Sequence, residues 1–227
     1  MAQQPLLQFS LDFVSIPTAL AAAFKVADQV DIIEVGTPLC KSAGMAAVRA
    51  VREVFPGKLI LADMKTPDVG DLEAQLAFEA GANMVTVMGG APLATLELAL
   101  KEARKTGNEV LVELTGVRDL YERSKEWQTL GVERMVYHRG WDEGLSSREW
   151  TQVDVDCLAW LSGQGFKVSV AGGITSELLP IFRNVPLSIV VAGRAIHRAP
   201  DPAAAARKMR KAIAEIWVSA ESLEQAA

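Results

Sequence analysis

The sequence has only two cysteines and two histidines among its 227 residues. Cys40 and Cys157 are too few for a disulfide framework and lack the paired spacing of a zinc site. The net charge of −5 leaves no basic excess, so we expect no nucleic-acid partner. No apolar run approaches the ~18 residues of a membrane span, and the amino terminus lacks the pattern of a signal peptide. We therefore expect a cytoplasmic protein with no membrane partner.

The sequence has the composition of a soluble globular protein, with half of its residues apolar and 22% charged. Its length fits one large α/β domain or two small ones. Short apolar runs recur along the chain, and no linker or low-complexity segment separates them. We therefore expect one domain over residues 1–218, followed by a frayed, non-functional tail over 219–227.

Eight short apolar runs are typical of strands, and a helix-like segment follows each. The runs are Leu6–Leu11, Val30–Val35, Lys58–Ala62, Met84–Met88, Glu109–Leu114, Arg134–Tyr137, Lys167–Val170 and Leu187–Val191. Alternating strands and helices predict a parallel sheet with right-handed crossovers. The alternative, an open doubly wound sheet, usually carries a glycine-rich loop after its first strand, and Leu11-Asp12-Phe13-Val14 is not one. We therefore predict an α/β fold, a single (β/α)8 TIM barrel with parallel strands.

Ionisable residues follow several of these runs, at the end of the barrel where the chemistry of this fold lies. Asp63 and Lys65 point to the same side, because side chains alternate along a strand. Glu34 ends the neighbouring run, so its carboxylate can converge with that of Asp63. Two carboxylates, substrate oxygens and water suit Mg²⁺. We expect Mg²⁺ at Glu34 and Asp63; the alternative is that each acid is a solvated rim residue or pairs with a lysine.

Lys65 is expected to stay protonated beside these acids and to stabilise a negative oxygen on a substrate. The alternative for Lys65 is a structural ion pair with Asp63. Thr66 and Pro67 suit the cap and first position of a helix, which puts Asp68 in its first turn. The helix dipole favours an acid there, so spacing alone predicts a structural role for Asp68.

Glycine turns follow the last two strands, at Gly172-Gly173 and at Gly193 before Arg194. Glycine lets backbone N–H groups approach an anion closely, and phosphate sites after the last two strands are frequent in these barrels. Arg194 can add a charged contact. We expect a phosphate group here; the alternative is two tight turns without a ligand.

His138 ends the sixth run and precedes Arg139. An imidazole can take or deliver a proton near neutral pH, so His138 is a candidate acid or base. The alternative is a hydrogen-bonded structural histidine. His197 lies beyond the last strand and is expected to be structural.

Seven elements of the sequence share their residue types with one known group of barrels. They are Asp12, Ile33-Glu34-Val35-Gly36-Thr37, Asp63-x-Lys65-x-x-Asp68, Glu113-Leu114-x-Gly116, Tyr137-His138-Arg139, Gly172-Gly173 and Ala192-Gly193-Arg194. In this pattern the chain resembles the orotidine monophosphate decarboxylase suprafamily, from about Leu6 to Trp217. The Asp-x-Lys-x-x-Asp element is specific to that suprafamily in a barrel context.

The resemblance implies a role for each of these residues. Glu34 and Asp63 are implied as the Mg²⁺ ligands. Contacts with the sugar and its reacting oxygens are implied for Asp12, Thr37, Lys65 and Glu113. The phosphate is implied to bind at Gly173, Gly193 and Arg194, and His138 to take part in protonating the intermediate. Members form homodimers in which the last acid of the motif, here Asp68, enters the partner's site.

Within the suprafamily the chain is most similar to the 3-keto-L-gulonate 6-phosphate decarboxylases, and also to their sister group, the hexulose-6-phosphate synthases. Both reactions pass through an anionic enediolate. Glu113 and the Tyr137–Arg139 run resemble the decarboxylases. Trp141 stands where those enzymes have arginine, and Ala171 where they have threonine; the segment around Ala171 resembles the synthases.

We therefore expect Mg²⁺-dependent decarboxylation of 3-keto-L-gulonate 6-phosphate to L-xylulose 5-phosphate and CO₂. The first alternative is the condensation of ribulose 5-phosphate with formaldehyde. The second is a non-catalytic barrel that binds a phosphosugar, because Trp141 cannot donate a proton as an arginine does. Arg139 is the candidate that can replace the missing donor.

Overall fold

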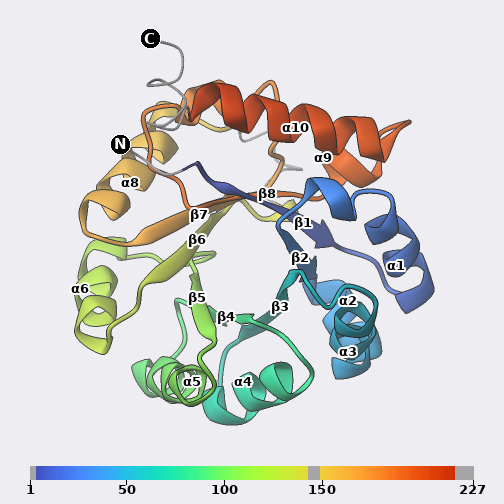
Figure 1. Cartoon of the computed structure of the whole chain (residues 1–227). Coiled ribbons are helices and arrows are strands. Elements are labelled where there is room, and N and C mark those ends of the chain that lie inside the picture. Colours follow the sequence, from blue (N-terminus) through green and yellow to red (C-terminus); the bar gives the residue numbers. More distant parts are fainter. Residues whose placement is uncertain (1–3, 143–148, 218–227) are drawn as a thin grey trace.

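The computed structural model describes residues 4–142 and 149–217. Within these residues eight parallel strands form a closed barrel in chain order, surrounded by helices (Figure 1). The strands are β1 (Leu6–Leu11), β2 (Ile32–Val35), β3 (Leu59–Thr66), β4 (Met84–Met88), β5 (Glu109–Glu113), β6 (Arg134–His138), β7 (Lys167–Ala171) and β8 (Ile189–Ala192). Because β1 pairs with β8, with Leu6 opposite Ile189, the sheet has no open edge. The predicted TIM barrel is confirmed.

Helices follow most of the strands on the outside of the barrel. They are α1 (Ile16–Phe24), α2 (Thr37–Ala43), α3 (Met45–Val54), α4 (Gly70–Glu79), α5 (Leu93–Thr106), α6 (Leu120–Leu130), α8 (Gln152–Gly163), α9 (Arg194–His197) and α10 (Pro202–Ile216), with 3₁₀ turns η1 (Ala27–Gln29) and η2 (Leu179–Phe182). The expectation of a helix after every strand is wrong for β7, since only η2 forms between β7 and β8. Pro180 and Pro186 in that segment lack the backbone donor that a continuing helix needs. The expected tail over 219–227 lies outside the described residues.

Apolar side chains alternate between two layers along each strand. Ile33 points outward and packs against the helices, whereas its neighbour Ile32 points into the barrel, and both are fully buried. The inner layer holds Ile32, Leu61, Met84, Leu111, Val136, Ala171, Ile189 and Val191. Each fully buried Ile or Leu side chain stabilises the fold by about 1.5–3 kcal/mol through removal of apolar surface from water. These layers make the barrel a rigid support for the side chains at its rim.

The third strand is longer and more irregular than the sequence predicts. It continues to Thr66, which pairs with Val87 of β4 after a shift in register that begins at Ala62. The helix α4 begins only at Gly70. Thr66 and Pro67 therefore do not cap a helix, and the expectation that Asp68 lies in a first helical turn is wrong: Asp68 lies in the connection between β3 and α4.

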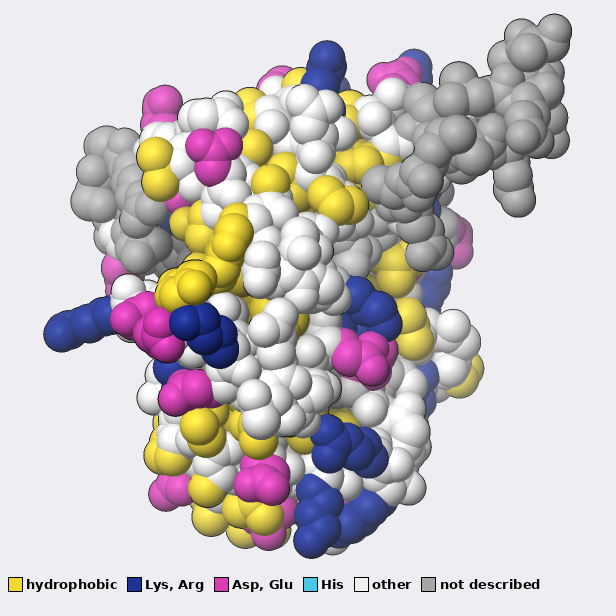
Figure 2. Space-filling view, turned by 90° about the vertical axis from the view of Figure 1, so that its left-hand side faces the viewer, with side chains coloured by type: hydrophobic (Ala, Val, Ile, Leu, Met, Phe, Trp, Pro, Cys, Tyr) yellow, Lys and Arg dark blue, Asp and Glu magenta, His cyan; other side chains and the backbone are white. Residues whose placement is uncertain are grey.

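In the described parts of the chain, no helix is long and apolar enough to span a lipid bilayer. On the side of α6 and α8, acidic and basic side chains are interspersed among apolar ones (Figure 2).

Candidate active site

A cavity of about 550 Å³ lies at the carboxyl-terminal ends of the strands, a volume suited to a small ligand. Every site residue predicted from the sequence lines this cavity except Asp68. The predicted residues in its lining are Asp12, Glu34, Thr37, Asp63, Lys65, Glu113, His138, Arg139, Gly173, Gly193 and Arg194. With Thr86 of β4 also in the lining, the barrel gathers residues from all eight strands and their loops around one space.

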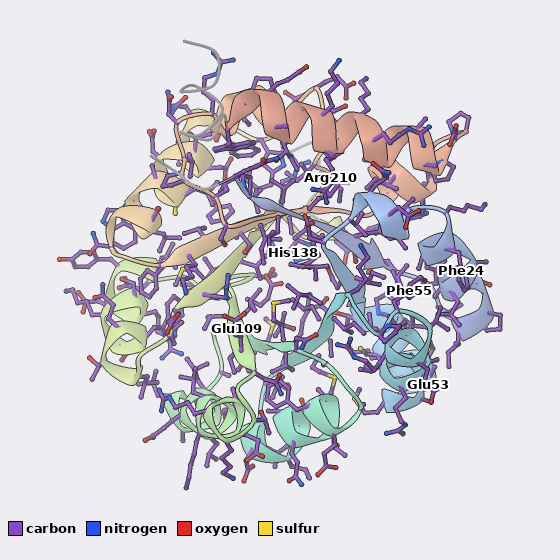
Figure 3. All side chains as sticks on the ribbon, in the orientation of Figure 1. Phe24, Glu53, Phe55, Glu109, His138 and Arg210 are labelled. Carbon is purple, nitrogen blue, oxygen red and sulfur yellow. The ribbon has the colours of Figure 1, made fainter. Side chains whose placement is uncertain are left out.

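An alternating row of charges crosses the cavity. The Lys65 Nζ atom lies 2.5 Å from Asp63 Oδ2 and 3.3 Å from Glu113 Oε2. The Nδ1 atom of His138 lies 3.2 Å from the same Glu113 oxygen. Figure 3 shows His138 inside the barrel, whereas Phe24 and Phe55 lie among the helices outside the strands. The row joins β3, β5 and β6, so two potential cations and two carboxylates share one network.

The network determines the charge of each member. Burial alone would lower the pKa of Lys65, but the carboxylates of Asp63 and Glu113 outweigh it and raise the pKa above its ordinary value. Burial alone would raise the pKa of Glu113, but the hydrogen bond and charge of His138 and the charge of Lys65 lower it to about 2. Lys65 is therefore an ammonium and Glu113 a carboxylate over the whole physiological range.

His138 is tuned in the direction that favours proton donation. Burial lowers the pKa of its imidazole, and the hydrogen bond and charge of Glu113 more than offset that effect, so the pKa is raised from 6.5. Thr115 donates to the other oxygen of Glu113 from its hydroxyl at 2.6 Å and from its backbone N–H at 3.1 Å. These two bonds fix the carboxylate, which in turn fixes the imidazole.

Asp63 is held by two threonine hydroxyls, only one of which the sequence analysis identified. Thr37 donates to Asp63 Oδ2 at 2.6 Å, and Thr86 donates to Asp63 Oδ1 at 2.8 Å. The same Thr86 oxygen accepts the backbone N–H of Lys65 at 2.9 Å. Lys65 has a φ of +48°, a left-handed conformation that is costly for a side chain with a Cβ. Thr86 therefore connects the carboxylate of Asp63 with the irregular backbone that aims Lys65.

The residues predicted to hold Mg²⁺ fit that ion by their charge and donor type. Burial, followed by the charges of Asp63 and Asp12, raises the pKa of Glu34 to about 8. A dication beside Glu34 relieves this surplus of negative charge. The carbonyl oxygen of Gln8, whose amide donates to Glu34 at 2.5 Å, is buried in the same cavity with no hydrogen-bond partner.

The protein supplies few ligands for such an ion. Among the residues that the structure describes, no group of three or more His, Cys, Asp or Glu side chains is arranged to hold a metal. If Glu34 and Asp63 hold the ion, they provide two carboxylates and not a full cage. This donor set suits Mg²⁺, which keeps several waters and binds through one or two carboxylates together with its substrate.

Asp12 lies where the first, second and last strands meet. Its Oδ2 atom accepts a hydrogen bond from Ser10 at 3.1 Å. A side chain at Gly36, after β2, would collide with the Asp12 carboxylate, and one at Gly193, after β8, would lie 3.5 Å from it. Glycine at position 36 therefore leaves the room that Asp12 needs to face the cavity.

The loops after β7 and β8, which were predicted to bind phosphate, also line the cavity. Gly173 has a φ of +69°, which favours glycine, and the Arg139 guanidinium would lie 2.8 Å from a Cβ at this position. Arg194 is the first residue of α9, directly after Gly193. Arginine is thus present on both the β6 and the β8 side of the Gly172-Gly173 turn.

Asp68 is the one predicted site residue that does not reach the cavity of its own chain. It is exposed, and its Oδ1 atom accepts the backbone N–H of Val69 at 2.8 Å. Val69 itself has a φ of +48°, which turns the chain into α4. The chain therefore presents Asp68 on its surface, in a sharply turned connection.

Comparison with known proteins places this site within a family. Residues 5–209 match the model described as "Orotidine 5'-phosphate decarboxylase / HUMPS family". The chain belongs to this family. A relative named 3-keto-L-gulonate-6-phosphate decarboxylase UlaD, from Escherichia coli, is 39% identical over 213 residues, which are 94% of this chain and 98% of the relative.

Solved structures of family members have the same fold along nearly the whole chain. KGPDC from Streptococcus mutans in complex with D-R5P has a TM-score of 0.92 at 34% identity, over 95% of this chain and all (100%) of that one. A 3-hexulose-6-phosphate synthase from Salmonella typhimurium has a TM-score of 0.89 at 34% identity, over 93% and 100% of the two chains. Both activities named among these relatives are lyase activities, and the chain is a carbon–carbon lyase.

Proposed function

We propose that this lyase decarboxylates 3-keto-L-gulonate 6-phosphate to L-xylulose 5-phosphate and CO₂ through an enediolate, with Mg²⁺ as its cofactor. The observation that carries the proposal is the position of the Lys65 ammonium between the Asp63 and Glu113 carboxylates, in a cavity that also contains His138. The decarboxylase relative from Escherichia coli, at 39% identity, supports the choice of substrate.

Decarboxylation of a β-keto acid leaves the electron pair of the broken C–C bond on the substrate as an enediolate. The Lys65 ammonium, which its acidic neighbours keep charged, stabilises the oxygen on which that charge develops. Mg²⁺, when held by Glu34 and Asp63, supplies a Lewis acid that polarises the sugar oxygens. The lining hydroxyl of Thr37 and the carboxylate of Asp12 are available to bind the sugar hydroxyls.

The enediolate must then gain a proton on the carbon that lost CO₂. His138 is the donor we propose, since its raised pKa keeps a larger fraction of the imidazole protonated near neutral pH. Glu113 orients the ring through Nδ1, which leaves Nε2 to carry the transferred proton. Arg139, the next residue in the chain, lines the same cavity as a second potential donor.

The substrate's phosphate is proposed to bind at Gly173, Gly193 and Arg194. Positive φ at Gly173 and the arginine that follows Gly193 support this position. The phosphate end then lies beside β7 and β8, and the reacting end lies beside β2, β3, β5 and β6. This orientation places the carbon chain of a six-carbon acid across the cavity.

The active unit is proposed to be a homodimer in which Asp68 enters the partner's site. Asp68 is exposed and absent from the cavity of its own chain. Val69, Leu72 and Leu76 follow it at helical spacing and are 51%, 53% and 43% exposed. An exposed apolar stripe next to a functional acid is the kind of surface that a second copy covers.

One observation favours the synthase reaction as a second candidate. Ala171 belongs to the apolar inner layer with Leu111, Val136 and Val191, and all four line the cavity. The alanine leaves this wall without a hydrogen-bonding side chain at the end of β7. A wall of this kind leaves room for a second, small electrophile such as formaldehyde, and structural relatives at 34% and 40% identity are hexulose-6-phosphate synthases.

Release of CO₂ from 3-keto-L-gulonate 6-phosphate tests the proposal. We expect release with Mg²⁺, little release in excess chelator, and loss of release in Lys65→Ala. Efficient condensation of ribulose 5-phosphate with formaldehyde, without CO₂ release from the keto acid, would refute the proposal in favour of the synthase. A sugar phosphate that binds equally to wild type and Lys65→Ala, with no turnover by either, would favour the phosphosugar-binding alternative.

A further inference from the structure

Trp141 lies at the mouth of the cavity and has two arginines on its indole ring. The Arg194 guanidinium carbon is 3.9 Å from the ring centroid, and that of Arg198 is 5.4 Å from it. Both distances are within the range of cation–π attraction. Trp141 follows β6, whereas the two arginines follow β8, so this contact crosses over the loop of β7 between them.

The second arginine of the cavity is held in the same manner. The Arg139 guanidinium carbon is 5.6 Å from the ring centroid of Trp150. Trp150 is buried, donates its indole N–H to Gly172 O at 2.9 Å, and packs edge-to-face on Phe182 at 5.2 Å. Arg139 also lies against Gly173. Each arginine beside the Gly172-Gly173 turn therefore lies within cation–π distance of its own tryptophan.

A cation–π contact can orient a guanidinium without using its N–H donors. The attraction acts through the face of the aromatic ring, whereas phosphate is bound by the N–H donors of the guanidinium. An arginine held against an aromatic ring is thus oriented, and loses less rotamer freedom, when it binds two oxygens of a phosphate. The two tryptophans differ in exposure, because Trp150 is buried and Trp141 is 45% exposed.

We propose that Trp141 is a positioning residue for phosphate: it fixes the Arg194 guanidinium so that Arg194 and Arg139 bind the substrate's phosphate from both sides of the Gly172-Gly173 turn. Arg198 adds a second positive charge to the same ring and strengthens attraction for a dianion. The inference rests on the proposed sugar-phosphate function and deepens it. It gives Trp141, which stands in place of a potential proton donor, a role in binding rather than in chemistry.

The test compares three variants by isothermal titration with inorganic phosphate and by steady-state kinetics. Trp141→Leu removes the aromatic face and keeps apolar bulk, and Trp141→Phe keeps an aromatic face. Tyr121→Leu is the matched control, because Lys125 lies 3.9 Å from the Tyr121 ring in a cation–π contact on α6 that is outside the cavity. Thermal unfolding of each variant establishes that it is folded.

We expect Trp141→Leu to raise the Kd for inorganic phosphate and the KM for the sugar phosphate about 5- to 30-fold, with kcat changed less than about threefold. Trp141→Phe and Tyr121→Leu should stay within about threefold of wild type in all three quantities. The proposal is overturned if Trp141→Leu binds phosphate as tightly as wild type does. It is also overturned if Trp141→Phe loses as much phosphate affinity as Trp141→Leu. If the wild-type protein releases no CO₂ but Trp141→Leu still weakens phosphate binding, the proposed reaction is refuted. The role of Trp141 in phosphate binding is then retained.

Discussion

The Oε2 atom of Glu113 lies 3.2 Å from Nδ1 of His138, at a carboxylate that is almost completely buried. This contact sets the charge state of the only histidine in the cavity lining. The other histidine, His197, contacts Phe13 with the ring centroids 5.1 Å apart and the planes tilted by 57°, and its pKa is lowered by burial and by the charge of Arg198. The two imidazoles are thus shifted in opposite directions.

We predict that a proton NMR titration separates the two histidines. The pKa of His138 should lie above 6.5, because the Glu113 carboxylate outweighs burial, and that of His197 below it, because burial and then the charge of Arg198 lower it. In Glu113→Gln the neutral amide removes the charge, so burial dominates and the His138 midpoint should fall below its wild-type value. His197 is the internal control and should not move. A His138 midpoint that is unchanged by Glu113→Gln would contradict the pairing.

The same pair predicts how stability depends on pH. The lowered pKa of Glu113 gives stability that is complete above 4.5 and is lost as pH falls toward about 2. The raised pKa of His138 gives stability that is complete below 6.5 and is lost as pH rises through that raised value. The difference in urea-unfolding free energy between wild type and Glu113→Gln should therefore be largest between pH 4.5 and 6.5. A difference in unfolding free energy that grows continuously toward alkaline pH would contradict this prediction.

We predict that the Thr86 hydroxyl is required for catalysis. Thr86→Val has nearly the same shape but leaves Asp63 Oδ1 and the Lys65 backbone N–H without this partner, at a cost of about 1–3 kcal/mol in unfolding free energy. We expect kcat to fall on the order of 10²-fold, because small displacements of catalytic groups cause losses of this size. The KM should change little. Thr86→Ser keeps the hydroxyl and should be close to wild type. Equal losses in both variants would assign Thr86 to packing instead.

For the metal, we predict that Asp63→Ala abolishes Mg²⁺-dependent turnover while the barrel stays folded. Binding of Mn²⁺, followed calorimetrically in the absence of substrate, should weaken in parallel because one of the two carboxylates is lost. Asp71→Ala, which removes an exposed acid in the first turn of α4, is the matched control and should bind Mn²⁺ as wild type does. Full activity in excess chelator would exclude the metal from the reaction.

For Asp68, we predict that two inactive variants restore each other. In a mixed dimer of Asp68→Ala and Lys65→Ala subunits, one site combines an intact Lys65 with the partner's Asp68. Random exchange should then regain about one quarter of wild-type activity, since half of the dimers are mixed and each has one intact site. If Asp68 acts within its own chain, proven mixed dimers should remain inactive.

The sequence predicts the barrel and most of the cavity because both depend on local patterns. Alternation along the strands puts Asp63 and Lys65 on one side, and strand ends bring Glu34, Glu113 and His138 to one rim. The Lys65 backbone could not be predicted in the same way. Its left-handed φ and the register shift of β3 depend on the contact with Thr86 from the next strand, which no local pattern contains.

Thr86 and Gln8 were missed for different reasons. A threonine is common in strands, so Thr86 between Val85 and Val87 is typical of a packing position. Gln8 lies two residues before Ser10 on the same face of β1. Two polar side chains on one face of a strand could have predicted that this face lines the cavity. The position of Asp68 outside its own cavity depends on a connection whose Val69 adopts a rare backbone conformation.

Decarboxylation in D₂O, followed by proton NMR of the product, tests the central claim most directly. We predict CO₂ release with one deuterium at C1 of L-xylulose 5-phosphate, because an enediolate takes its proton from a group that exchanges with solvent. Loss of CO₂ and product in Lys65→Ala should accompany this result. Product without deuterium at C1, or no product from a preparation that binds phosphate and Mn²⁺, would contradict the account.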